Sequence, residues 1–232
     1  MKKVLVVEDE TAIREFEVIN LNRAGYTTVE APNGEEALRL FHEEGDFDIA
    51  LLDISMPGID GFTVCKEMRK TSQSIGIIML TAKTQEMDKI SGLMMGADDY
   101  ITKPFSPSEL TARVDSLYRR VEMQQNAVAP KAEEEIRLGD FTLNLRRRSL
   151  MKGDKNIELT QVEFQIIEYF FTNPDTALDR TDILNRVWGD GYFGEEKIVD
   201  VNIRRLRMKI EDDPSKPRHI ITVWGMGYKW AV

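Results

Sequence analysis

Hydrophobic and polar positions follow two alternating patterns in the first half of the chain. Short apolar runs, typical of buried strands, occupy residues 4–7, 27–30, 47–52, 75–80 and 98–101. Segments with helical periodicity fill the gaps, at residues 11–23, 34–44, 60–70, 85–95 and 107–121. Strands that alternate with helices pair in parallel, and right-handed crossovers place the helices on both faces of the sheet. The pattern therefore predicts an α/β doubly wound fold with five parallel strands.

Residues with special backbone preferences stand at the predicted ends of these helices. Glycines stand where three of the helices should stop, at Gly25, Gly45 and Gly96. Two residues are expected N-caps, Asn33 and Ser106, and Pro107 falls at a first helical position. The boundaries of the helices are thus predicted by two independent signals.

The periodicity is lost and the chain becomes polar at residues 121–135, which is typical of a flexible linker. We expect a first domain at residues 1–121, a linker at 122–135 and a second domain at 136–232. Part of this stretch can extend the preceding helix.

The second domain begins with period-two alternation at residues 136–145, which predicts strands rather than helices. Further short strands are expected at 148–151 and 157–159, so a small antiparallel sheet should form. Three helices follow, at residues 160–171 with a Thr-x-x-Glu capping box, at 181–188 with Thr181 as the cap, and at 196–211. A hairpin with arms at 219–224 and 228–230 ends the chain. The second domain is therefore predicted to be α+β.

Polar residues follow the ends of four strands of the first domain. They are Glu8 and Asp9, Asp53, Thr81, and Lys103 with Pro104. Ligands of doubly wound folds gather at this edge of the sheet. Carboxylates that meet there repel one another unless a cation or protons intervene, and Mg²⁺ prefers such hard oxygen ligands.

A carboxylate can also attack phosphorus to form an aspartyl phosphate, and Thr and Lys can donate to its oxygens. One Asp at a strand end is more often a turn cap, so the prediction rests on the whole set.

The third helix of the second domain combines an apolar stripe with basic residues. The stripe comprises Ile198, Val201, Ile203, Leu206 and Ile210. Mostly off the stripe lie Lys197, Asn202, Arg204, Arg205 and Arg207. A helix with one buried face and one basic face suits the major groove of DNA, although charge alone is equally consistent with a solvated surface.

Composition narrows the function classes. The net charge is −9, but residues 197–210 hold five basic residues against the single acid Asp200, so DNA binding would depend on this local cluster. The chain has no run near the ~20 apolar residues of a membrane span, and its start is too short an apolar stretch for a signal peptide. One cysteine, Cys65, excludes an internal disulfide and suits a reducing cytoplasm. The histidines, His42 and His219, are too few and too far apart to favour a zinc site or a His-dependent triad.

The first domain resembles a response-regulator receiver domain, which has a flavodoxin-like fold. The resemblance rests on Val-Val-Glu-Asp-Glu at 6–10, Leu-Leu-Asp-Ile-Ser-Met-Pro-Gly at 51–58, Met-Leu-Thr-Ala-Lys at 79–83 and Gly-Ala-Asp-Asp-Tyr-Ile-Thr-Lys-Pro-Phe at 96–105. It implies that Asp53 accepts a phosphoryl group from a sensor histidine kinase. It further implies an acidic pocket of Glu8 and Asp9, with Asp9, Asp53 and the Ser55 carbonyl as direct Mg²⁺ ligands.

The same resemblance implies a switch. Lys103 contacts the phosphoryl group, and its bond to Pro104 is expected to be cis. Thr81 moves toward the phosphoryl oxygens and Tyr100 turns inward behind it. Receivers of the OmpR/PhoB subfamily form homodimers through ion pairs, which would here be Lys89–Glu109, Asp99–Arg113 and Asp98–Arg120. An ordinary solvated face is the alternative for these charges.

Residues 136–232 resemble the winged-helix effector domain of the OmpR/PhoB subfamily. The resemblance rests on Lys-Ile-Val-Asp-Val-Asn-Ile-Arg-Arg-Leu-Arg at 197–207 and on the Gly-Met-Gly-Tyr hairpin at 225–228. It implies that Lys197, Asn202, Arg204, Arg205 and Arg207 face double-stranded promoter DNA, with Thr222 in the wing. The loop 189–195 would meet RNA polymerase. The chain departs from the pattern at Trp224, where the wing often carries an Arg.

These features predict a cytoplasmic, phosphorylation-switched transcription regulator that is not an enzyme. Two other classes of protein fit the sequence less well. A phosphate-ester hydrolase with Asp53 as nucleophile commonly needs a carboxylate two residues on, where this chain has Ser55. A DNA-binding architectural protein that ignores phosphorylation would not need the complete set of pocket residues.

Overall fold

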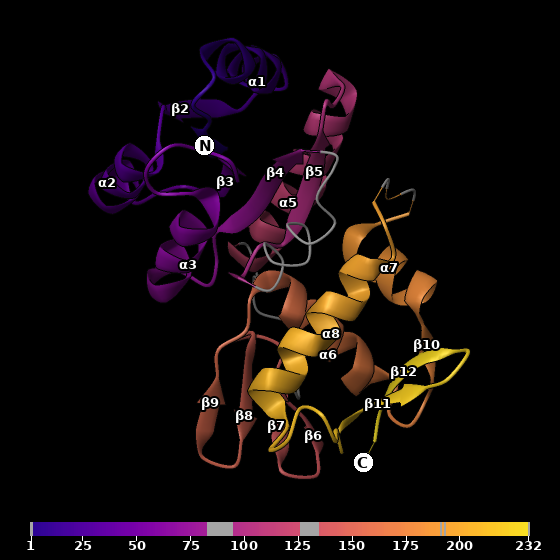
Figure 1. Ribbon diagram of the computed structural model, residues 1–232. Coiled ribbons are helices and arrows are strands. Elements are labelled where there is room, and N and C mark those ends of the chain that lie inside the picture. The colour runs from indigo at the N-terminus through magenta and orange to yellow at the C-terminus, as the bar shows by residue number, and fades with distance from the viewer. Residues whose placement is uncertain (1, 83–94, 126–134, 191, 193, 232) are drawn as a thin grey trace. The chain divides into compact units, whose positions relative to one another are not determined.

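The computed structural model describes residues 2–82, 95–125, 135–190, 192 and 194–231. The chain forms two compact units, Met1–Glu122 and Met123–Val232, and each is described by itself (Figure 1). The helix α5 at the end of the first unit extends to Gln125.

The first unit is built on a five-stranded parallel sheet with the order β2-β1-β3-β4-β5. The strands are β1 (Lys3–Val7), β2 (Thr27–Ala31), β3 (Ile49–Asp53), β4 (Gly76–Ala82) and β5 (Asp99–Lys103). The helices are α1 (Thr11–Arg23), α2 (Gly34–Glu44), α3 (Gly61–Thr71) and α5 (Pro107–Gln125). The predicted doubly wound fold with five parallel strands is confirmed. The helix expected at 85–95 lies outside the described residues except for its last residue.

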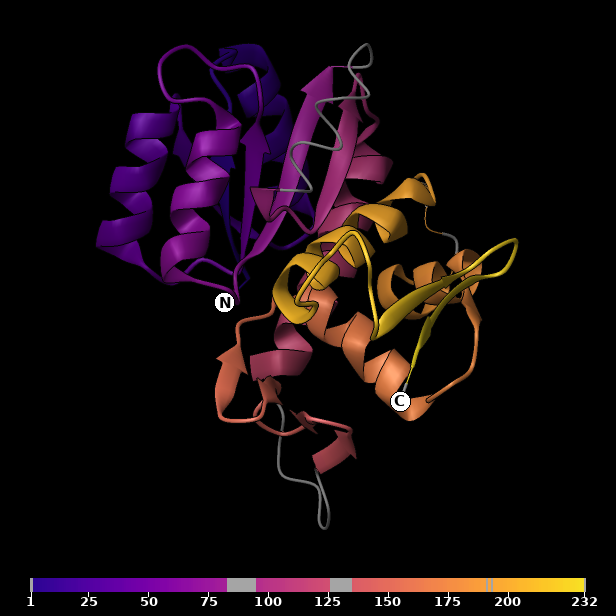
Figure 2. The ribbon, with the colours of Figure 1, turned by 60° about the horizontal axis from the view of Figure 1, so that its bottom comes forward.

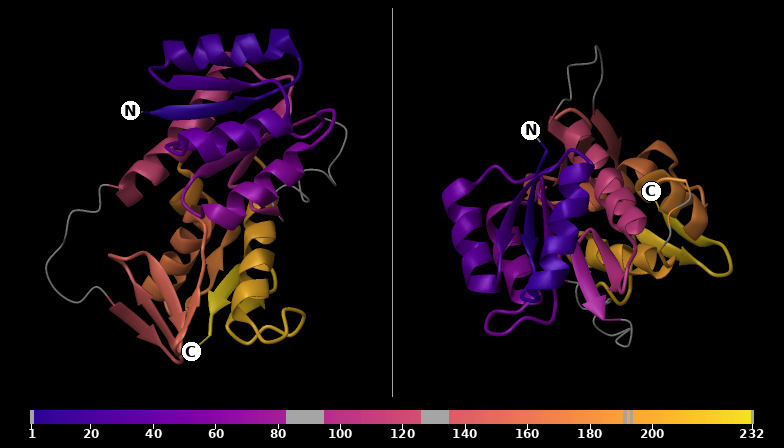
Figure 3. Two further views of the ribbon diagram at one scale, coloured as in Figure 1. Left: turned by 90° about the vertical axis from the view of Figure 1, so that its left-hand side faces the viewer. Right: turned by 90° about the horizontal axis from the view of Figure 1, so that it is seen from above.

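Helices cover both faces of this sheet. Leu21 of α1 and Leu110, Val114 and Leu117 of α5 form one core with alternate strand residues such as Val6. The intervening strand residues Leu5, Leu52 and Ile77 are also fully buried, as expected when a second layer covers the other face. The helices α2 and α3 pack side by side, on the face opposite α1 (Figures 2 and 3).

The predicted caps of this unit are confirmed. The Asn33 side chain accepts from the Glu36 backbone N–H at 2.8 Å. The Ser106 hydroxyl accepts from the Glu109 N–H at 3.1 Å, and α5 begins at Pro107. Gly45 ends α2 with a φ of 66°, a conformation that glycine adopts without strain.

The described residues of the second unit form two antiparallel sheets and three helices. One sheet has the order β6-β7-β8-β9, with β6 (Glu135–Leu138), β7 (Phe141–Asn144), β8 (Ser149–Lys152) and β9 (Lys155–Ile157). The helices are α6 (Gln161–Thr172), α7 (Arg180–Trp188) and α8 (Lys197–Ile210). The other sheet has the order β10-β12-β11, with β10 (Leu178–Asp179), β11 (Ile220–Val223) and β12 (Gly227–Trp230).

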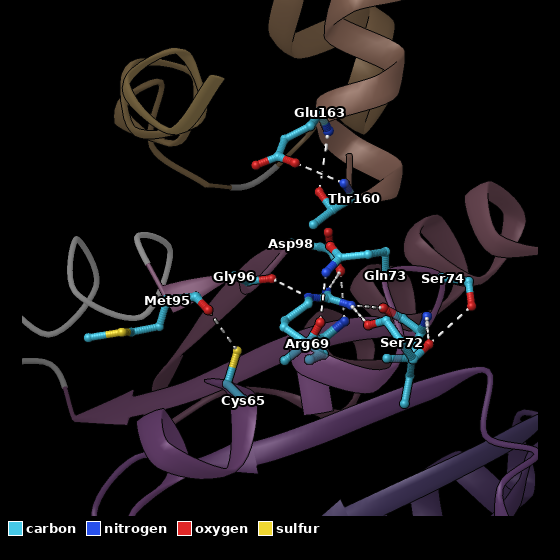
Figure 4. A network of polar contacts seen from close by, with 12 residues as sticks. Cys65, Arg69, Ser72, Gln73, Ser74, Met95, Gly96, Asp98, Thr160 and Glu163 are labelled. Atoms are coloured by element: carbon cyan, nitrogen blue, oxygen red, sulfur yellow. Dashed lines mark hydrogen bonds and ion pairs between the residues drawn. The ribbon is translucent and has the colours of Figure 1, made fainter. Parts of the chain in front are cut away.

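Two local predictions in this unit need correction. The strand β10 was not expected, because two residues are too few to show period-two alternation, and β10 is defined only by its pairing with β12. The helix α7 is capped by Asp179 rather than Thr181, because the Asp179 carboxylate accepts from the Asp182 N–H at 2.7 Å. The capping box of Thr160 and Glu163 is confirmed (Figure 4).

Within the described part of the chain, no helix combines the length and the apolar character that crossing a membrane requires.

Candidate functional site

An acidic cluster forms at the carboxyl edge of the parallel sheet. Glu8 and Asp9 follow β1, and Asp53 is the last residue of the neighbouring strand β3, in which Leu52 lies opposite Val7. One carboxylate oxygen from each of the three residues lies within 4.8 Å of the others. Glu8 and Asp53 are buried and Asp9 is half-buried. The structure thus brings together the three carboxylates that the sequence placed at strand ends.

Lys103, the last residue of β5, supplies a positive charge to this cluster. Its Nζ lies 2.6 Å from Glu8 Oε2 and 3.0 Å from Asp53 Oδ1. The Lys103–Pro104 peptide bond is cis, as expected. Three carboxylates face one ammonium group, so the pocket retains negative charge that a divalent cation could neutralise.

The pKa values of two pocket residues are shifted by their surroundings. Burial raises the pKa of Glu8; its hydrogen bond from Lys103 opposes this and the charge of Asp53 adds to it. Burial lowers the pKa of Lys103, but the hydrogen bond to Glu8 and the charge of Asp53 outweigh it, so the net pKa is raised. Lys103 therefore remains an ammonium group and balances part of the carboxylate charge.

A glycine lets α3 begin directly against the phosphoacceptor candidate. A Cβ atom on Gly61 would lie 2.1 Å from the Asp53 carbonyl oxygen, closer than any side chain can stand. The Asp60 side chain caps α3 by accepting from the Thr63 N–H at 2.8 Å. The β3–α3 loop is therefore fixed at both ends, and it holds the backbone of Asp53.

The other residues expected in the switch lie on the same edge or near it. Thr81 of β4 is buried, and its hydroxyl donates to the Ala82 carbonyl at 3.3 Å. Tyr100 of β5 is buried opposite Met79 of β4. Ser55 is exposed in the loop that follows β3. Their assigned roles remain predictions.

Glu17 is a buried carboxyl group that the sequence analysis missed. It is fully buried in α1, and neither of its carboxyl oxygens has a hydrogen-bond partner among the described residues. Burial, followed by the charge of Glu8, raises its pKa to about 8. The available signal was its position four residues before Leu21, which places both on the face of α1 that meets the core.

Asp98 is buried, whereas the expected intersubunit pair with Arg120 required it to lie on an exposed face. It is fully buried and accepts from Arg69 at 2.6 Å and from the Ile77 N–H at 2.8 Å (Figure 4). Arg69 of α3 also donates to the carbonyls of Gly96 and Ile75, at 2.8 and 2.6 Å. This network explains the difference, because an arginine from α3 already neutralises Asp98 within the unit.

The remaining residues of the expected dimer face also interact within one chain. Arg113 of α5 lies 3.2 Å from Asp99 and 3.3 Å from Glu109. Arg120 donates to the Ser116 carbonyl at 3.2 Å. Lys89 lies outside the described residues. The Asp99–Arg113 pair is therefore formed inside a single chain in this structure.

The expected basic face of α8 is smaller than the sequence suggested. The apolar stripe of α8 is buried as predicted, and Lys197 and Arg204 are exposed. Arg207 is half-buried and donates to Thr222 Oγ1 at 2.9 Å. Thr222 itself is partly exposed in β11.

Asn202 and Arg205 do not lie on that face, which corrects the prediction that they do. Asn202 is fully buried and its amide donates to the Ile198 carbonyl at 2.8 Å. Arg205 is buried 2.9 Å from Glu163 of α6, and Lys209 lies 2.6 Å from the same carboxylate. Burial raises the pKa of Glu163, but the charges of Arg205 and Lys209 outweigh it, so the net pKa is lowered. The ion pair with the buried Glu163 carboxylate therefore accounts for the burial of Arg205.

Comparisons with known proteins agree with both units. Residues 4–115 match the family described as "Response regulator receiver domain", and residues 154–230 match "Transcriptional regulatory protein, C terminal". Among solved structures, the response regulator DrrB of Thermotoga maritima, described as an OmpR/PhoB homolog, shares 29% identity over 100% of both chains with a TM-score of 0.51.

Two further structures agree with the fold. A response regulator receiver domain protein from Clostridium thermocellum matches with 26% identity over 53% of this chain and 98% of its own, with a TM-score of 0.51. A RitR mutant shares 24% identity over 99% of both chains with a TM-score of 0.78, and this similarity concerns the fold alone.

A receiver domain joined to a transcriptional regulatory domain defines a response regulator. This chain belongs to the OmpR/PhoB subfamily of two-component response regulators. Its receiver implies a histidine kinase partner, and its C-terminal domain implies DNA binding.

Proposed function

We propose that phosphorylation of Asp53 by a sensor histidine kinase switches this regulator to a dimer that binds promoter DNA. The observation that carries the proposal is the position of Lys103, whose ammonium group bridges Glu8 and Asp53. A cation held against the candidate nucleophile is suitably placed to donate to the oxygens of an incoming phosphoryl group.

The transfer requires only simple chemistry from the pocket. A carboxylate oxygen of Asp53 forms a bond to phosphorus while the phosphorus–nitrogen bond of a phosphohistidine breaks, and the nitrogen keeps the electron pair. Lys103 then donates to a phosphoryl oxygen. The Thr81 hydroxyl gains a charge-assisted hydrogen bond only after transfer, which favours the phosphorylated conformation. Tyr100 is proposed to fill the space behind Thr81.

The acidic cluster fits Mg²⁺ because all its donors are hard oxygen atoms. We assign Asp9, Asp53 and the Ser55 carbonyl as direct ligands, with Glu8 completing the acidic pocket. When bound, the ion neutralises charge on the phosphoryl group during transfer. Lys103 orients Asp53 through their ion pair, and Glu8 holds Lys103 in place.

Dimerisation is proposed to use the face of β5 and α5. Ion pairs that now form within one chain, such as Asp99–Arg113, would exchange for pairs between subunits. Glu109 and Arg120 would take part, with Lys89 from the segment outside the described residues. Two linked effector units then bind tandem half-sites with an increased effective concentration.

DNA contact is assigned to the exposed basic residues Lys197 and Arg204, with Arg207 and Thr222 at the junction of α8 and β11. Lysine and arginine at such positions neutralise phosphates and read base edges in the major groove. The loop 189–195, of which residues 191 and 193 lie outside the described part, is proposed to contact RNA polymerase.

The test compares the wild type with Asp53→Ala, with the exposed Asp46→Ala as a matched control. Each protein is incubated with acetyl phosphate and Mg²⁺, and its mass and its affinity for DNA are measured. The wild type and the control should dimerise and bind DNA more tightly, and Asp53→Ala should do neither. Equal dimerisation of Asp53→Ala would show that the phosphoacceptor assignment is wrong.

A further inference from the structure

The peptide that joins Glu8 to Asp9 is held by an arginine from α1. Nη1 of Arg14 donates to the Glu8 carbonyl at 2.7 Å. A peptide unit is planar, so a bond to its carbonyl oxygen restrains the directions of both residues that flank it. Glu8 and Asp9 supply two of the three carboxylates of the acidic cluster. The Arg14 contact therefore acts on both of these carboxylates at once.

Arg14 uses a second nitrogen atom to reach the strand β2. Its Nε lies 3.3 Å from Glu30 Oε2. The Arg14 side chain is 13% exposed, whereas that of Glu30 is 48% exposed. An ion pair so open to water contributes little stability, so the main effect of Glu30 is to orient the guanidinium group. The planar guanidinium group serves both acceptors in one orientation, which the ammonium group of a lysine cannot match.

Other contacts restrain the same turn from different sides. The Glu8 N–H donates to the Ala31 carbonyl at the end of β2, at 3.2 Å. The Glu8 carboxylate accepts from the Glu10 N–H at 3.2 Å and from Lys103 at 2.6 Å. The Arg14 bond adds a direct link from the Glu8–Asp9 peptide to the body of α1, which packs against β1 and β2 (Figure 3).

The charge of Arg14 and its orienting contact have opposite effects on a metal ion in the pocket. A positive charge next to the pocket repels a divalent cation, so the charge alone would weaken binding of Mg²⁺. Well-oriented oxygen ligands strengthen binding, because Mg²⁺ demands near-ideal octahedral geometry. Groups that only hold the ligands of a metal commonly change its affinity about 10–100-fold. The sign of the change on removing Arg14 therefore distinguishes the two effects.

We propose that Arg14 is a positioning residue for the acidic pocket. By holding the Glu8–Asp9 peptide against α1, it orients the Glu8 and Asp9 carboxylates toward Asp53 and increases the affinity of the pocket for Mg²⁺. The proposal rests on the metal site of the proposed function and adds a residue that touches neither the ion nor the phosphoryl group. Arg14 therefore affects metal binding and not the rate of transfer once the ion is bound.

The first experiment measures Mg²⁺ binding to the unphosphorylated full-length chain by isothermal titration calorimetry. Arg14→Ala should raise the Kd for Mg²⁺ about tenfold. Arg14→Lys keeps the charge and one donor, so it should restore part of the affinity. Arg23→Ala is the matched control, because Arg23 is an exposed arginine in the last turn of the same helix, and it should bind Mg²⁺ as the wild type does.

The second experiment follows phosphorylation by acetyl phosphate at increasing Mg²⁺ concentrations. Arg14→Ala should need about ten times more Mg²⁺ to reach half of its maximal rate. The maximal rate itself should stay within about twofold of the wild type, because Arg14 makes no contact that forms only during transfer. Loss of folded protein would instead lower the maximal rate without changing the Mg²⁺ concentration at half of it, and circular dichroism measures the folded fraction.

Glu30→Gln provides a milder variant that leaves Arg14 in place. The amide keeps an acceptor for the guanidinium group but loses the charge, so the Kd for Mg²⁺ should rise only about twofold. If Arg14→Ala does not fold, Arg14→Lys and Glu30→Gln still test the proposal. Binding of Mg²⁺ by both variants as tightly as by the wild type would then overturn it.

Each other result overturns a defined statement. If the wild type binds no Mg²⁺, or Asp9→Ala binds it equally well, the metal site of the proposed function is wrong and the role of Arg14 fails with it. If the wild type binds Mg²⁺ through Asp9 but Arg14→Ala binds it as tightly or more tightly, the metal site stands and the positioning role is wrong. A lower maximal rate of Arg14→Ala at an unchanged Kd would also contradict that role, because Arg14 would then act on transfer.

Discussion

Arg69 and Asp98 form a buried ion pair of 2.6 Å that joins α3 to the segment preceding β5. The arginine is 7% exposed and the aspartate 0% exposed. The same carboxylate accepts from the Ile77 N–H at the start of β4, so three segments converge on one charge. Removing one partner of such a pair leaves the other charge buried and uncompensated.

Arg69→Ala should therefore destabilise the receiver by about 3–5 kcal/mol, because Asp98 would remain buried without its cation. Urea unfolding followed by circular dichroism, with hydrogen exchange of the Ile77 amide, measures the loss. Lys70→Ala is the matched control, since the Lys70–Glu67 pair is exposed and should contribute at most about 1 kcal/mol. Equal stabilities for the two variants would show that the buried network is not stabilising.

Glu17 should make the receiver less stable as pH rises. Its pKa is about 8 in the folded chain and 4.5 in a model peptide, so the folded state binds the proton more tightly. The stability associated with this proton is present below pH 4.5 and is lost as pH rises through about 8. By pH 7 the loss amounts to about 3 kcal/mol.

Glu17→Gln should remove this pH dependence and raise stability at pH 7, because the amide cannot ionise. Thermal unfolding between pH 5 and 9 tests this, with the exposed Glu15→Gln as the control. A pH profile identical to that of the wild type would mean that Glu17 is ionised without cost in the folded chain.

Gly61→Ala should reduce both stability and phosphorylation of Asp53. Its Cβ would meet the Asp53 carbonyl oxygen at 2.1 Å, so α3 or the end of β3 must move. Overpacking of this kind costs about 1–3 kcal/mol, and the shift would displace Asp53, the proposed phosphoacceptor. The rate of phosphorylation by acetyl phosphate measures the second effect. Thr63→Ala, an exposed change in the first turn of α3, should leave that rate unchanged.

Arg204 and Arg205 are neighbours in sequence but should respond differently to substitution. Arg204→Ala should weaken DNA binding and make its salt slope shallower by about one unit, with little effect on stability. Arg205→Ala should destabilise the effector unit, because Glu163 would keep only Lys209 as a cationic partner. Emission of the buried Trp188 and Trp230 follows unfolding of that unit. If Arg204→Ala instead lost stability, the assignment of Arg204 to DNA contact and of Arg205 to stability would be wrong.

The parallel sheet was predictable from the sequence because the hydrophobic periodicity and the residues at the ends of the helices indicate the same element boundaries. Apolar runs, glycines and caps each pointed to the same boundaries, and α1 and α2 span the expected residues 11–23 and 34–44. The acidic cluster was also predictable, since carboxyl ends of neighbouring parallel strands meet at one edge. A pattern of local signals sufficed for both.

Residues whose environment depends on distant partners could not be placed in this way. Asp98 and Arg205 are charged, and a charged residue in a sequence is normally assigned to the surface. Their burial depends on Arg69 and Glu163, which lie 29 and 42 positions away. The spacing of Glu17 to Leu21 placed it on the buried face of α1, but it could not show that the carboxyl group would lack a hydrogen-bond partner among the described residues.

The sequence by itself determined the two-unit organisation, the fold of the receiver and the acidic cluster at the carboxyl edge of its sheet. Only the tertiary structure decided which charges are neutralised inside the chain and which remain available to a partner. The physical reason is that propensity and periodicity are local, whereas the free energy of a charge depends on burial and on the opposite charge that the fold brings within about 3 Å.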